Sequence, residues 1–303
     1  MDANGYAWWY IDATSDDGAH ALTLIAFVGS VFSPYYAKAR ADGLARPDDF
    51  VASNVCLYGP RSRWALNEHH RGHVEREHDM LRIARTSWAW TGSSLDVSLY
   101  ETTTPLRQRV IGTVRLIPEI VHERTYVLDG NGRHLWRPVA PRARVEVDFQ
   151  SPRFSWRGRG YHDVNMGTEP LEHGFTRWSW SRVSDARSTV VTYDVMPQTD
   201  ESVALRFSGQ NVERITMPAV KKLSASRWGV ARDVHCDAGH APRLAAAFED
   251  TPFYNRSLVE TRCGGVSGLA MHESVDLTRF VQPWVQFLLP FRMQRHARMQ
   301  RNA

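Results

Sequence analysis

The chain has 303 residues and a formal net charge of +4, carried almost entirely by arginine because only three residues are lysines. A chain of this length buries a substantial core in one large or two medium domains. Its scattered basic residues, without a lysine run, a zinc-finger spacing or a long basic helix, exclude nucleic acid as the main partner. Its cysteines, Cys56, Cys236 and Cys263, are odd in number and lack metal-type spacing, so we expect reduced thiols in a cytosolic protein.

Most periodic segments alternate apolar and polar residues with a period of two, which is typical of strands half-buried in a sheet. In chain order, the clearest of these expected strands are residues 6–13, 21–28, 95–99, 143–149, 203–207 and 254–262. Gly, Asp, Asn and Pro separate them, as turns require. Helical patterns are few, at residues 33–42 and 277–300. The sequence therefore predicts a mainly β fold.

A faint internal repeat divides the chain. The aromatic residues 8–10, an acidic turn and the apolar strand 22–28 are echoed by the pair Trp178 and Trp180, an acidic turn and the apolar strand 189–195. Such spacing is typical of two related β domains. Two matches are also within what chance produces in a chain with 11 tryptophans.

The repeat predicts an N-terminal domain of residues 1–157 and a C-terminal domain of residues 158–303. Tandem β-barrels or sandwiches leave an apolar interior or cleft for a greasy ligand. We therefore expect a pocket at or near the junction of the two domains.

A polar cluster lies close to that junction, where His162, Asp163 and Asn165 are flanked by glycines on both sides. One interpretation is a polar site beside a pocket, in which the histidine shuttles a proton or orients a carboxylate. The other interpretation, which the residues alone favour, is a turn. There Asp163 and Asn165 would bond the backbone and the glycines would supply positive φ angles.

Asp194 interrupts the apolar strand 189–195, and alternation places it on one face with Thr192 while Tyr193 lies on the other. Burial of the Asp194 face would raise the pKa of this carboxyl above its ordinary value of about 3.9. A protonated acid would then be available at neutral pH. The pattern equally allows an outward, solvated Asp194.

Trp178 and Trp180 share one face of a strand. Such an aromatic wall binds a polyene or stabilises a carbocation by roughly 0.5–2 kcal/mol per contact. Ordinary core packing is the alternative.

Four histidines, His69, His70, His73 and His78, suggest a metal site by number. Their segment, residues 67–79, is highly charged and has no nearby cysteine to complete a ligand set. We therefore predict a solvated hairpin or loop and no metal.

The C-terminal segment joins apolar aromatic residues, including Trp284 and Phe291, to a series of arginines that contains Arg292, Arg295 and Arg298. It has the composition of a segment that lies at a membrane interface. A last core strand with a basic tail fits equally well. The first residues lack the pattern of a secretory signal, and the longest apolar runs are too short to span a membrane.

Several longer stretches form a recognisable set: the N-terminal run of residues 6–36, residues 54–60, GRGYHD at 158–163, WSWSR at 178–182, and Tyr193-Asp194. Together they resemble the bacterial carotenoid 1,2-hydratases, also called hydroxyneurosporene synthases. The resemblance covers most of the chain, and its most specific part is the N-terminal run. The related superfamily motif reads HDHN followed by an aromatic residue, whereas Val164 and Met166 stand at its last histidine and aromatic positions here.

The resemblance implies tandem lipocalin-like β domains and cofactor-free addition of water to the terminal C1=C2 bond of acyclic carotenoids such as neurosporene and lycopene. Asp194 matches the family's proposed acid, which would protonate C2. Trp178, Trp180 and Tyr193 would then shield the cation at C1. Water would add there with His162 or Asp163 orienting it, and Asn165 completes the candidate binding residues.

Because the substrate would come from a bilayer, we expect a protein peripherally associated with the cytoplasmic side of the inner or photosynthetic membrane through Trp284, Phe291, Arg292 and Arg295. Two other functions remain open at this point. One is a lipocalin-like carrier that binds polyenes or lipids without chemistry, and the other is a related cyclase or pericyclase.

Overall fold

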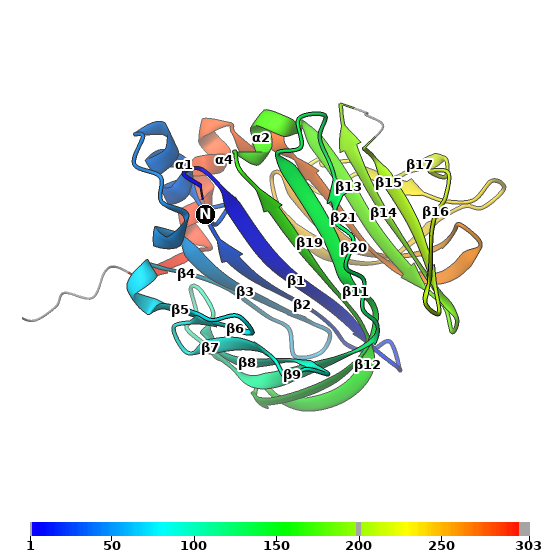
Figure 1. Ribbon diagram of the computed structural model, residues 1–303, viewed down its shortest axis with the longest axis horizontal. Coiled ribbons are helices and arrows are strands. Elements are labelled where there is room, and N and C mark those ends of the chain that lie inside the picture. The colour runs from blue at the N-terminus through cyan, green and yellow to red at the C-terminus, as the bar shows by residue number, and fades with distance from the viewer. Residues whose placement is uncertain (1, 198–200, 297–303) are drawn as a thin grey trace, which may run out of the picture. The chain divides into compact units, whose positions relative to one another are not determined.

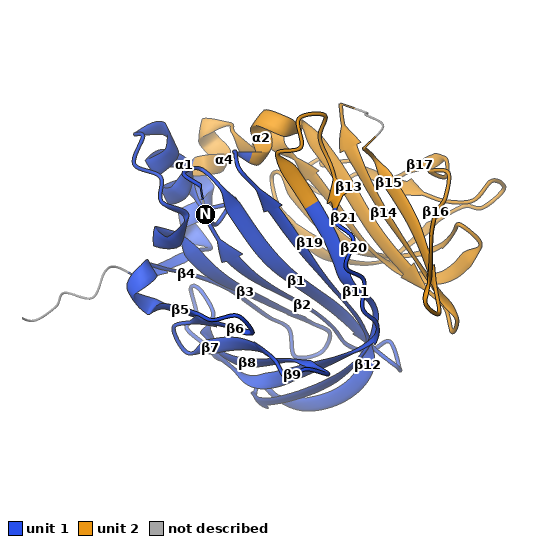
Figure 2. Ribbon diagram, in the orientation of Figure 1, with its two compact units in different colours: residues 1–125, 136–170, 287–303 blue, residues 126–135, 171–286 orange. Residues whose placement is uncertain are grey.

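The computed structural model describes residues 2–197 and 201–296, which form two compact units (Figures 1 and 2). Unit 1 takes the described residues of 1–125, 136–170 and 287–303, and unit 2 takes those of 126–135 and 171–286. The expected boundary after residue 157 lies inside a continuous strand of unit 1. The tandem domains and the pocket at their junction stay predictions.

Unit 1 is built on a strongly curled sheet (Figure 1). The strand order in this sheet is β22-β4-β3-β2-β1-β12-β11-β9-β8-β7-β6-β5, with β10 beside β11. The strands of this sheet are β1 (Tyr6–Ser15), β2 (Ala21–Val28), β3 (Val51–Tyr58), β4 (Arg63–His69), β5 (Val74–Arg76), β6 (Met80–Ile83), β7 (Thr86–Trp90), β8 (Leu95–Thr102), β9 (Arg109–Ile120), β10 (Tyr126–Val127), β11 (His134–Ser151), β12 (Arg153–Gly167) and β22 (Gln294–His296). Of these, β10 and the first two residues of β11 are assigned to unit 2. Short helical elements are α1 (Pro34–Ala41), η1 (Pro47–Asp49) and η2 (Arg71–His73).

Alternation along these strands builds the core of unit 1. Ile11 lies opposite Leu24, which lies opposite Val55, and all three are fully buried in one apolar cluster. Neighbours that are in register on one face bury their side chains together, because successive residues of a strand point to opposite faces. The inner face of the curled sheet is therefore apolar.

Unit 2 is a seven-stranded antiparallel sheet of order β16-β15-β14-β13-β21-β20-β19, with a two-stranded ribbon, β17–β18. Its strands are β13 (Arg177–Ser184), β14 (Ser188–Met196), β15 (Val203–Ser208), β16 (Asn211–Arg214), β17 (Val220–Leu223), β18 (Arg232–His235), β19 (Arg243–Asp250), β20 (Tyr254–Cys263) and β21 (Val266–Asp276). Strand β18 packs against β13 and β21. The helical elements nearby in sequence are α2 (Leu171–Gly174), α3 (Leu277–Phe280), α4 (Pro283–Leu288) and η3 (Leu289–Phe291).

The predicted mainly β fold is confirmed, and so is the first predicted helix. Ser33 caps α1, its hydroxyl accepting a hydrogen bond from the Tyr36 backbone N–H at 3.2 Å. The second predicted helix is confirmed only in part, because residues 277–296 form the short helical elements α3, α4 and η3 in place of one continuous helix and then end in the strand β22. Pro283 begins α4, and Pro290 interrupts it by removing a backbone donor. Residues 297–300 lie outside the described part.

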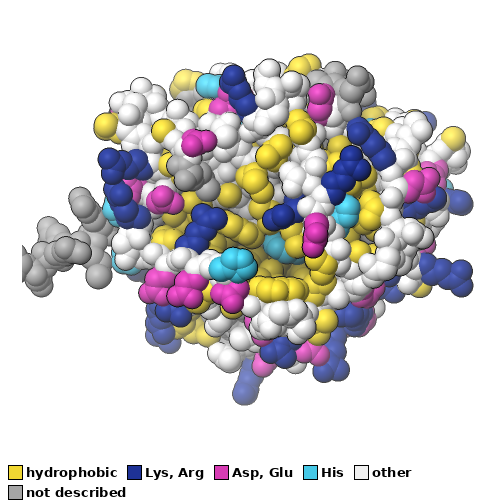
Figure 3. Space-filling view, in the orientation of Figure 1, with side chains coloured by type: hydrophobic (Ala, Val, Ile, Leu, Met, Phe, Trp, Pro, Cys, Tyr) yellow, Lys and Arg dark blue, Asp and Glu magenta, His cyan; other side chains and the backbone are white. Residues whose placement is uncertain are grey.

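Acidic and basic side chains are interspersed over the face drawn in Figure 3. Within residues 2–197 and 201–296, no helix is both long enough and apolar enough to cross a membrane.

Candidate functional site

Asp194 lies in β14, one strand away from the middle of the sheet of unit 2, and the residue is only 4% exposed. It stands opposite Ser179 of β13, while its neighbour Tyr193 stands opposite Trp180. Directly opposed residues of antiparallel strands share a face. Asp194 therefore lies on the face of Ser179 and Thr192, and that face is buried at this position.

The Asp194 carboxylate has two side-chain hydrogen-bond partners, one distant in the sequence and one close. Its Oδ2 lies 3.0 Å from Nε2 of His235, 41 residues along the chain in β18. Its Oδ1 accepts a hydrogen bond from the Ser202 hydroxyl at 2.9 Å. The other ring nitrogen of His235, Nδ1, lies 2.6 Å from the carbonyl oxygen of Pro218.

These contacts fix how many protons the pair holds. A carbonyl oxygen only accepts, so His235 Nδ1 must carry a hydrogen. The short contact between Nε2 and Oδ2 then requires one proton between them, because two facing lone pairs would repel. The Asp194–His235 pair is therefore either imidazolium with carboxylate or neutral imidazole with carboxylic acid, and it is neutral overall in both forms.

The expectation of a raised Asp194 pKa is wrong. Burial raises the pKa of this carboxyl, but the hydrogen bond and positive charge of His235 lower the pKa by a larger amount. The pKa of Asp194 therefore lies below its ordinary value. Burial alone would lower the pKa of His235, but the hydrogen bonds to Asp194 and to the Pro218 carbonyl, together with the nearby negative charges, outweigh burial and raise this pKa. A hydrogen-bonded base thus reverses the direction of the pKa shift that burial alone would give a carboxyl.

The aromatic candidates lie on the other face of the same sheet. Trp180 stands opposite Tyr193 and Trp178 opposite Val195, and the rings of Trp178 and Tyr193 are 6.4 Å apart. All three candidate rings are buried. The structure brings Trp178, Trp180 and Tyr193 together with one another and not with the Asp194 carboxyl, as the strand alternation predicts.

More polar side chains share the Asp194 face. The Ser181 hydroxyl lies 2.7 Å from Nδ1 of His272, and the Ser274 hydroxyl lies 3.1 Å from its Nε2. Burial lowers the pKa of His272 to about 3, so this second histidine is neutral. Arg232 in β18 donates to Ser257 at 3.0 Å. Under the β17–β18 ribbon, the sheet therefore carries a buried polar layer.

The His162 segment is a strand and not the turn that its glycines suggest. Residues 153–167 form β12, which pairs along its length with β1. None of its glycines has a positive φ. A Cβ at Gly158 would come within 2.0 Å of the Thr14 carbonyl oxygen, and one at Gly160 within 2.6 Å of a Val145 methyl group. These glycines permit close packing of neighbouring strands.

His162 and Asp163 point to opposite faces of β12, because His162 stands opposite Ile11 and Asp163 opposite Tyr10. The His162 ring is buried, and its Nδ1 lies 2.9 Å from the Tyr10 carbonyl oxygen. Burial lowers its pKa to about 4. Neutral His162 therefore donates from Nδ1, which leaves Nε2 as a hydrogen-bond acceptor.

The Asp163 carboxylate accepts hydrogen bonds from three side-chain donors. Its Oδ2 accepts from the Trp136 indole N–H and the Tyr161 hydroxyl, both at 2.8 Å, and its Oδ1 accepts from the Asn165 amide at 3.3 Å. Asn165 therefore lies next to Asp163, and its role in substrate binding stays a prediction. Burial beside this carboxylate raises the pKa of Tyr161 well above its usual range.

The predicted solvated histidine segment is partly wrong. Residues 67–69 are buried at the end of β4, where His69 stacks on His296 with ring centroids 4.5 Å apart. His70 and His73 are only partly buried, and His78 is exposed. Among the residues that the structure describes, no three His, Cys, Asp or Glu side chains form a group able to hold a metal ion.

The C-terminal residues predicted to contact a membrane differ in their surroundings. Trp284 is 44% exposed and stacks on Trp228, and Phe291 is 64% exposed. The Arg292 guanidinium lies over the Trp64 ring, and the Arg295 guanidinium lies over the Tyr35 ring. These two arginines are therefore engaged with aromatic faces of unit 1. Arg298 lies outside the described residues.

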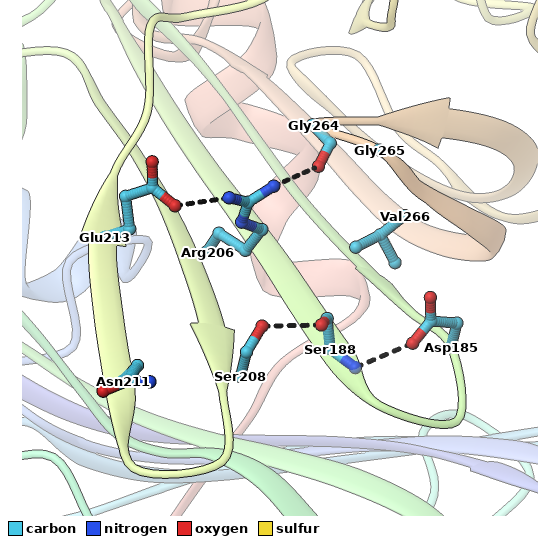
Figure 4. Close-up of a pocket in the computed structure, with 9 residues that line it drawn as sticks. All are labelled: Asp185, Ser188, Arg206, Ser208, Asn211, Glu213, Gly264, Gly265 and Val266. Atoms are coloured by element: carbon cyan, nitrogen blue, oxygen red, sulfur yellow. Dashed lines mark hydrogen bonds and ion pairs between the residues drawn. The ribbon is translucent and has the colours of Figure 1, made fainter.

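Two surface pockets are lined by other residues. The pocket in Figure 4, about 400 Å³, lies in unit 2 around the Arg206–Glu213 ion pair and the Ser188–Ser208 hydroxyl contact. A larger one in unit 1, about 780 Å³, includes Asp96, Arg115, Glu146 and Asp148. The lining of the larger pocket also contains the apolar side chains of Val97, Val114, Val147 and Trp156.

The fold is that of the lipocalin-like β proteins. The chain superimposes on a putative AttH from Nitrosomonas europaea with a TM-score of 0.58, at 11% identity and over 89% of this chain and 91% of that one. Kievitone hydratase from Nectria haematococca gives a TM-score of 0.51, at 9% identity over 89% and 88% of the two chains. At such identities these likenesses show the fold alone.

The sequence comparisons define the family. The profile of the family described as "Carotenoid hydratase CrtC" matches residues 24–302. Proteins named acyclic carotenoid 1,2-hydratase are 46% identical in Thiocapsa roseopersicina, over 96% of this chain and 73% of that one, and 41% identical in Rubrivivax gelatinosus, over 97% and 74%. A further one in Cereibacter sphaeroides is 34% identical over 90% and 98%. The chain belongs to the carotenoid hydratase family.

Sequence reasoning missed His235 and Ser202. Ser202 follows β14 closely, but neither residue lies in a recognisable motif. Pairing with Asp194 depends on how the β17–β18 ribbon folds over the sheet. The one available signal was that an apolar strand with a central carboxylate requires a polar partner when it is buried.

Proposed function

We propose that this chain adds water to the terminal C1=C2 double bond of an acyclic carotenoid such as neurosporene or lycopene, and that Asp194 is the acid. The observation that carries the proposal is the buried Asp194–His235 pair in a chain of the carotenoid hydratase family. The finer assignment of substrate and residues is ours.

The chemistry requires an acid placed away from bulk water. A trisubstituted alkene accepts a proton at C2 so that the positive charge falls on tertiary C1. A weak base such as an alkene is protonated only by an acid held in place beside it, in surroundings where water does not compete for the proton. Asp194, 4% exposed and hydrogen-bonded on both oxygens, meets these requirements when the pair is in its imidazole–carboxylic acid form.

His162 is the better of the two candidates to orient the attacking water. Neutral His162 offers Nε2 as an acceptor for a water hydrogen. Asp163 already accepts hydrogen bonds from Trp136, Tyr161 and Asn165, which favours an anchoring role for this carboxylate. Addition of water transfers no electrons, so protonation and capture complete the reaction.

The aromatic residues are proposed to bind the polyene chain. Trp178, Trp180 and Tyr193 form a contiguous set of rings, and flat rings pack well against a conjugated hydrocarbon. Because they lie on the face opposite to Asp194, they would contact a part of the substrate that is remote from the protonated bond.

Membrane association is proposed to involve Trp284 and Phe291, whose exposed rings fit the interface of a bilayer. Arg292 and Arg295 would contribute less, because both stack on rings of the protein itself. The proposed location is the cytoplasmic side of the inner or photosynthetic membrane, with a peripheral attachment.

The purified chain incubated with lycopene or neurosporene in detergent tests this function. Mass spectrometry is expected to find a product heavier by one water. A tight complex with unchanged carotenoid would favour a carrier, and a rearranged product of unchanged mass would favour a cyclase. Either of these results would overturn the hydratase assignment.

A further inference from the structure

We infer that residues 292–296, which contain the strand β22, form an acid-released clamp on the edge of the large sheet. The clamp is docked on β4 at neutral pH and detaches when the histidines that join the two strands become protonated. Detachment would uncover the edge of β4 and free the guanidinium groups of Arg292 and Arg295. The supporting contacts all lie within unit 1, and none of them takes part in the proposed hydration.

The first support is the pairing of β22 with β4. The strand β22 is the outermost of its sheet and runs parallel to the end of β4. Arg295 stands opposite Glu68, and His296 stands opposite His69. A strand of three residues opens locally far more easily than the long central strands. The side chains of the clamp therefore decide much of whether it stays docked.

Two arginines anchor the clamp at any pH. The Arg292 guanidinium lies 4.1 Å from the centroid of the Trp64 ring. The Arg295 guanidinium lies over the rings of Tyr35 and Phe50, at 4.5 and 4.9 Å from their centroids. Such contacts are worth roughly 0.5–1 kcal/mol each at exposed sites. Because arginine stays protonated, these contacts give the clamp no pH dependence of their own.

The acid-sensitive part is a stack of histidine rings. The rings of His69 and His296 are parallel to within 3°, with centroids 4.5 Å apart, and the His73 ring lies 5.6 Å from that of His69. Burial and the two neighbouring histidines lower the pKa of His69 to about 3. Burial, His73 and Arg107 lower the pKa of His296. Both stacked rings are therefore neutral in the docked form, and their protonation would place like charges side by side.

Glu68 responds to pH in the opposite sense. Its side chain is fully buried, and its Oε1 lies 3.5 Å from Nη1 of Arg295. Burial raises the pKa of this carboxyl to about 7, although the Ser33 hydroxyl and Arg295 lower it by a smaller amount. The docked form thus favours a protonated Glu68, and through this group a falling pH holds the clamp more tightly.

The remaining charged groups beside the stack are engaged with one another. Asp49 of η1 forms ion pairs with His70, at 2.8 Å, and with Arg71, at 2.7 Å. The titration of the clamp therefore reduces to the two stacked histidines on one side and Glu68 on the other.

The protons bound by the two forms give the direction of the effect. The detached form binds protons on His69 and His296 below their ordinary pKa of about 6.5, so between pH values of about 7.5 and 5.5 these two rings favour detachment by up to about a hundredfold. Over the same interval Glu68, with a docked pKa of about 7 and an ordinary one of 4.5, favours docking by about twentyfold. The histidines win, and acid should shift the equilibrium several-fold toward the detached form.

Hydrogen exchange followed by mass spectrometry tests the clamp in the full chain, at pH values of about 7.5 and 5.5 on either side of the ordinary histidine pKa. Rates are divided by the intrinsic exchange rate at each pH. Protection of residues 292–296 should fall several-fold on acidification, while the central strand β1 keeps its protection. Unchanged protection of 292–296 would overturn the inference, and so would an equal loss in β1, which would indicate unfolding of the whole unit.

Two variants separate the opposing groups. Glu68→Gln removes the carboxyl that resists opening, so its acid-induced loss of protection should grow to as much as about a hundredfold. His69→Phe with His296→Phe keeps two stacked rings but leaves Glu68 as the titrating group. Protection in this variant should rise on acidification by about tenfold or more, which reverses the sign of the wild-type response.

The exposed His78, replaced by phenylalanine, is the matched control and should keep the wild-type response. A fall in protection in the double phenylalanine variant equal to that of the wild type would overturn the role of the histidine stack. If that variant does not fold, Glu68→Gln still decides, because a response equal to the wild type would contradict the proposed balance of protons.

Discussion

Two buried aspartates in this protein differ in what surrounds them. Asp163 in unit 1 is held by an indole, a phenol and an amide, all of which donate hydrogen bonds. Asp194 in unit 2 is held by a hydroxyl and by an imidazole that gains and loses a proton. Burial alone does not distinguish them, since both are below 5% exposed. A buried carboxylate becomes a usable acid when its partner is a base.

The largest expected difference is in stability. Asparagine at position 163 presents an N–H₂ group toward buried donors, so at least one donor loses its acceptor. Asp163→Asn should lower the free energy of unfolding by roughly 2–4 kcal/mol. Asp194→Asn should cost only about 1 kcal/mol, because its amide can donate to a neutral His235 while its oxygen accepts from Ser202.

Urea unfolding followed by circular dichroism measures both values. Equal losses in the two variants would contradict the distinction between an anchoring and a titrating carboxylate.

A second difference concerns the attacking water. His162→Gln should reduce kcat about tenfold, within the range of general acid–base contributions. Unchanged turnover in His162→Gln would remove His162 from the site. Steady-state rates with lycopene provide the measurement, and the exposed His78, replaced in the same way, serves as the control.

The pH dependence of stability should also separate the two aspartates. The raised pKa of His235 contributes stability that is fully present below the unfolded value of about 6.5 and is lost as pH rises through the folded pKa. The lowered pKa of Asp194 contributes stability present above about 3.9, which is lost as pH falls through its folded pKa.

The stability advantage of the wild type over His235→Gln should therefore be greatest between these limits. A pH-independent difference would argue against a charged pair.

The smallest effect is expected at the surface. Replacing Trp284 and Phe291 together by serine should weaken partitioning onto liposomes of mixed neutral and anionic lipids several-fold, because two exposed rings are lost. Leu106→Ser, which removes a side chain that is 75% exposed elsewhere, is the matched control. Equal partitioning of both variants in a flotation assay would remove these rings from the membrane contact.

Strand alternation predicted much of this picture. It gave the mainly β fold, the burial pattern of strands such as β14, and the separation of Tyr193 from Asp194 on opposite faces. It could not give the pKa of Asp194, because that depends on His235, which only the folded β17–β18 ribbon brings near. Gly158 and Gly160 suggested a turn but lie in a strand, because close packing of strands favours glycine as much as turns do. Residues 277–296 have an apolar pattern that suits one long helix, but Pro283 and Pro290 divide the segment into short elements.

The central claim, that Asp194 is the acid, is tested most directly by the hydration rate of Asp194→Asn beside that of Asp163→Asn, measured per folded molecule. We expect a loss of about 10²-fold or more for Asp194→Asn, and a rate within a few-fold of the wild type for Asp163→Asn. Hydration by Asp194→Asn at the wild-type rate would contradict it.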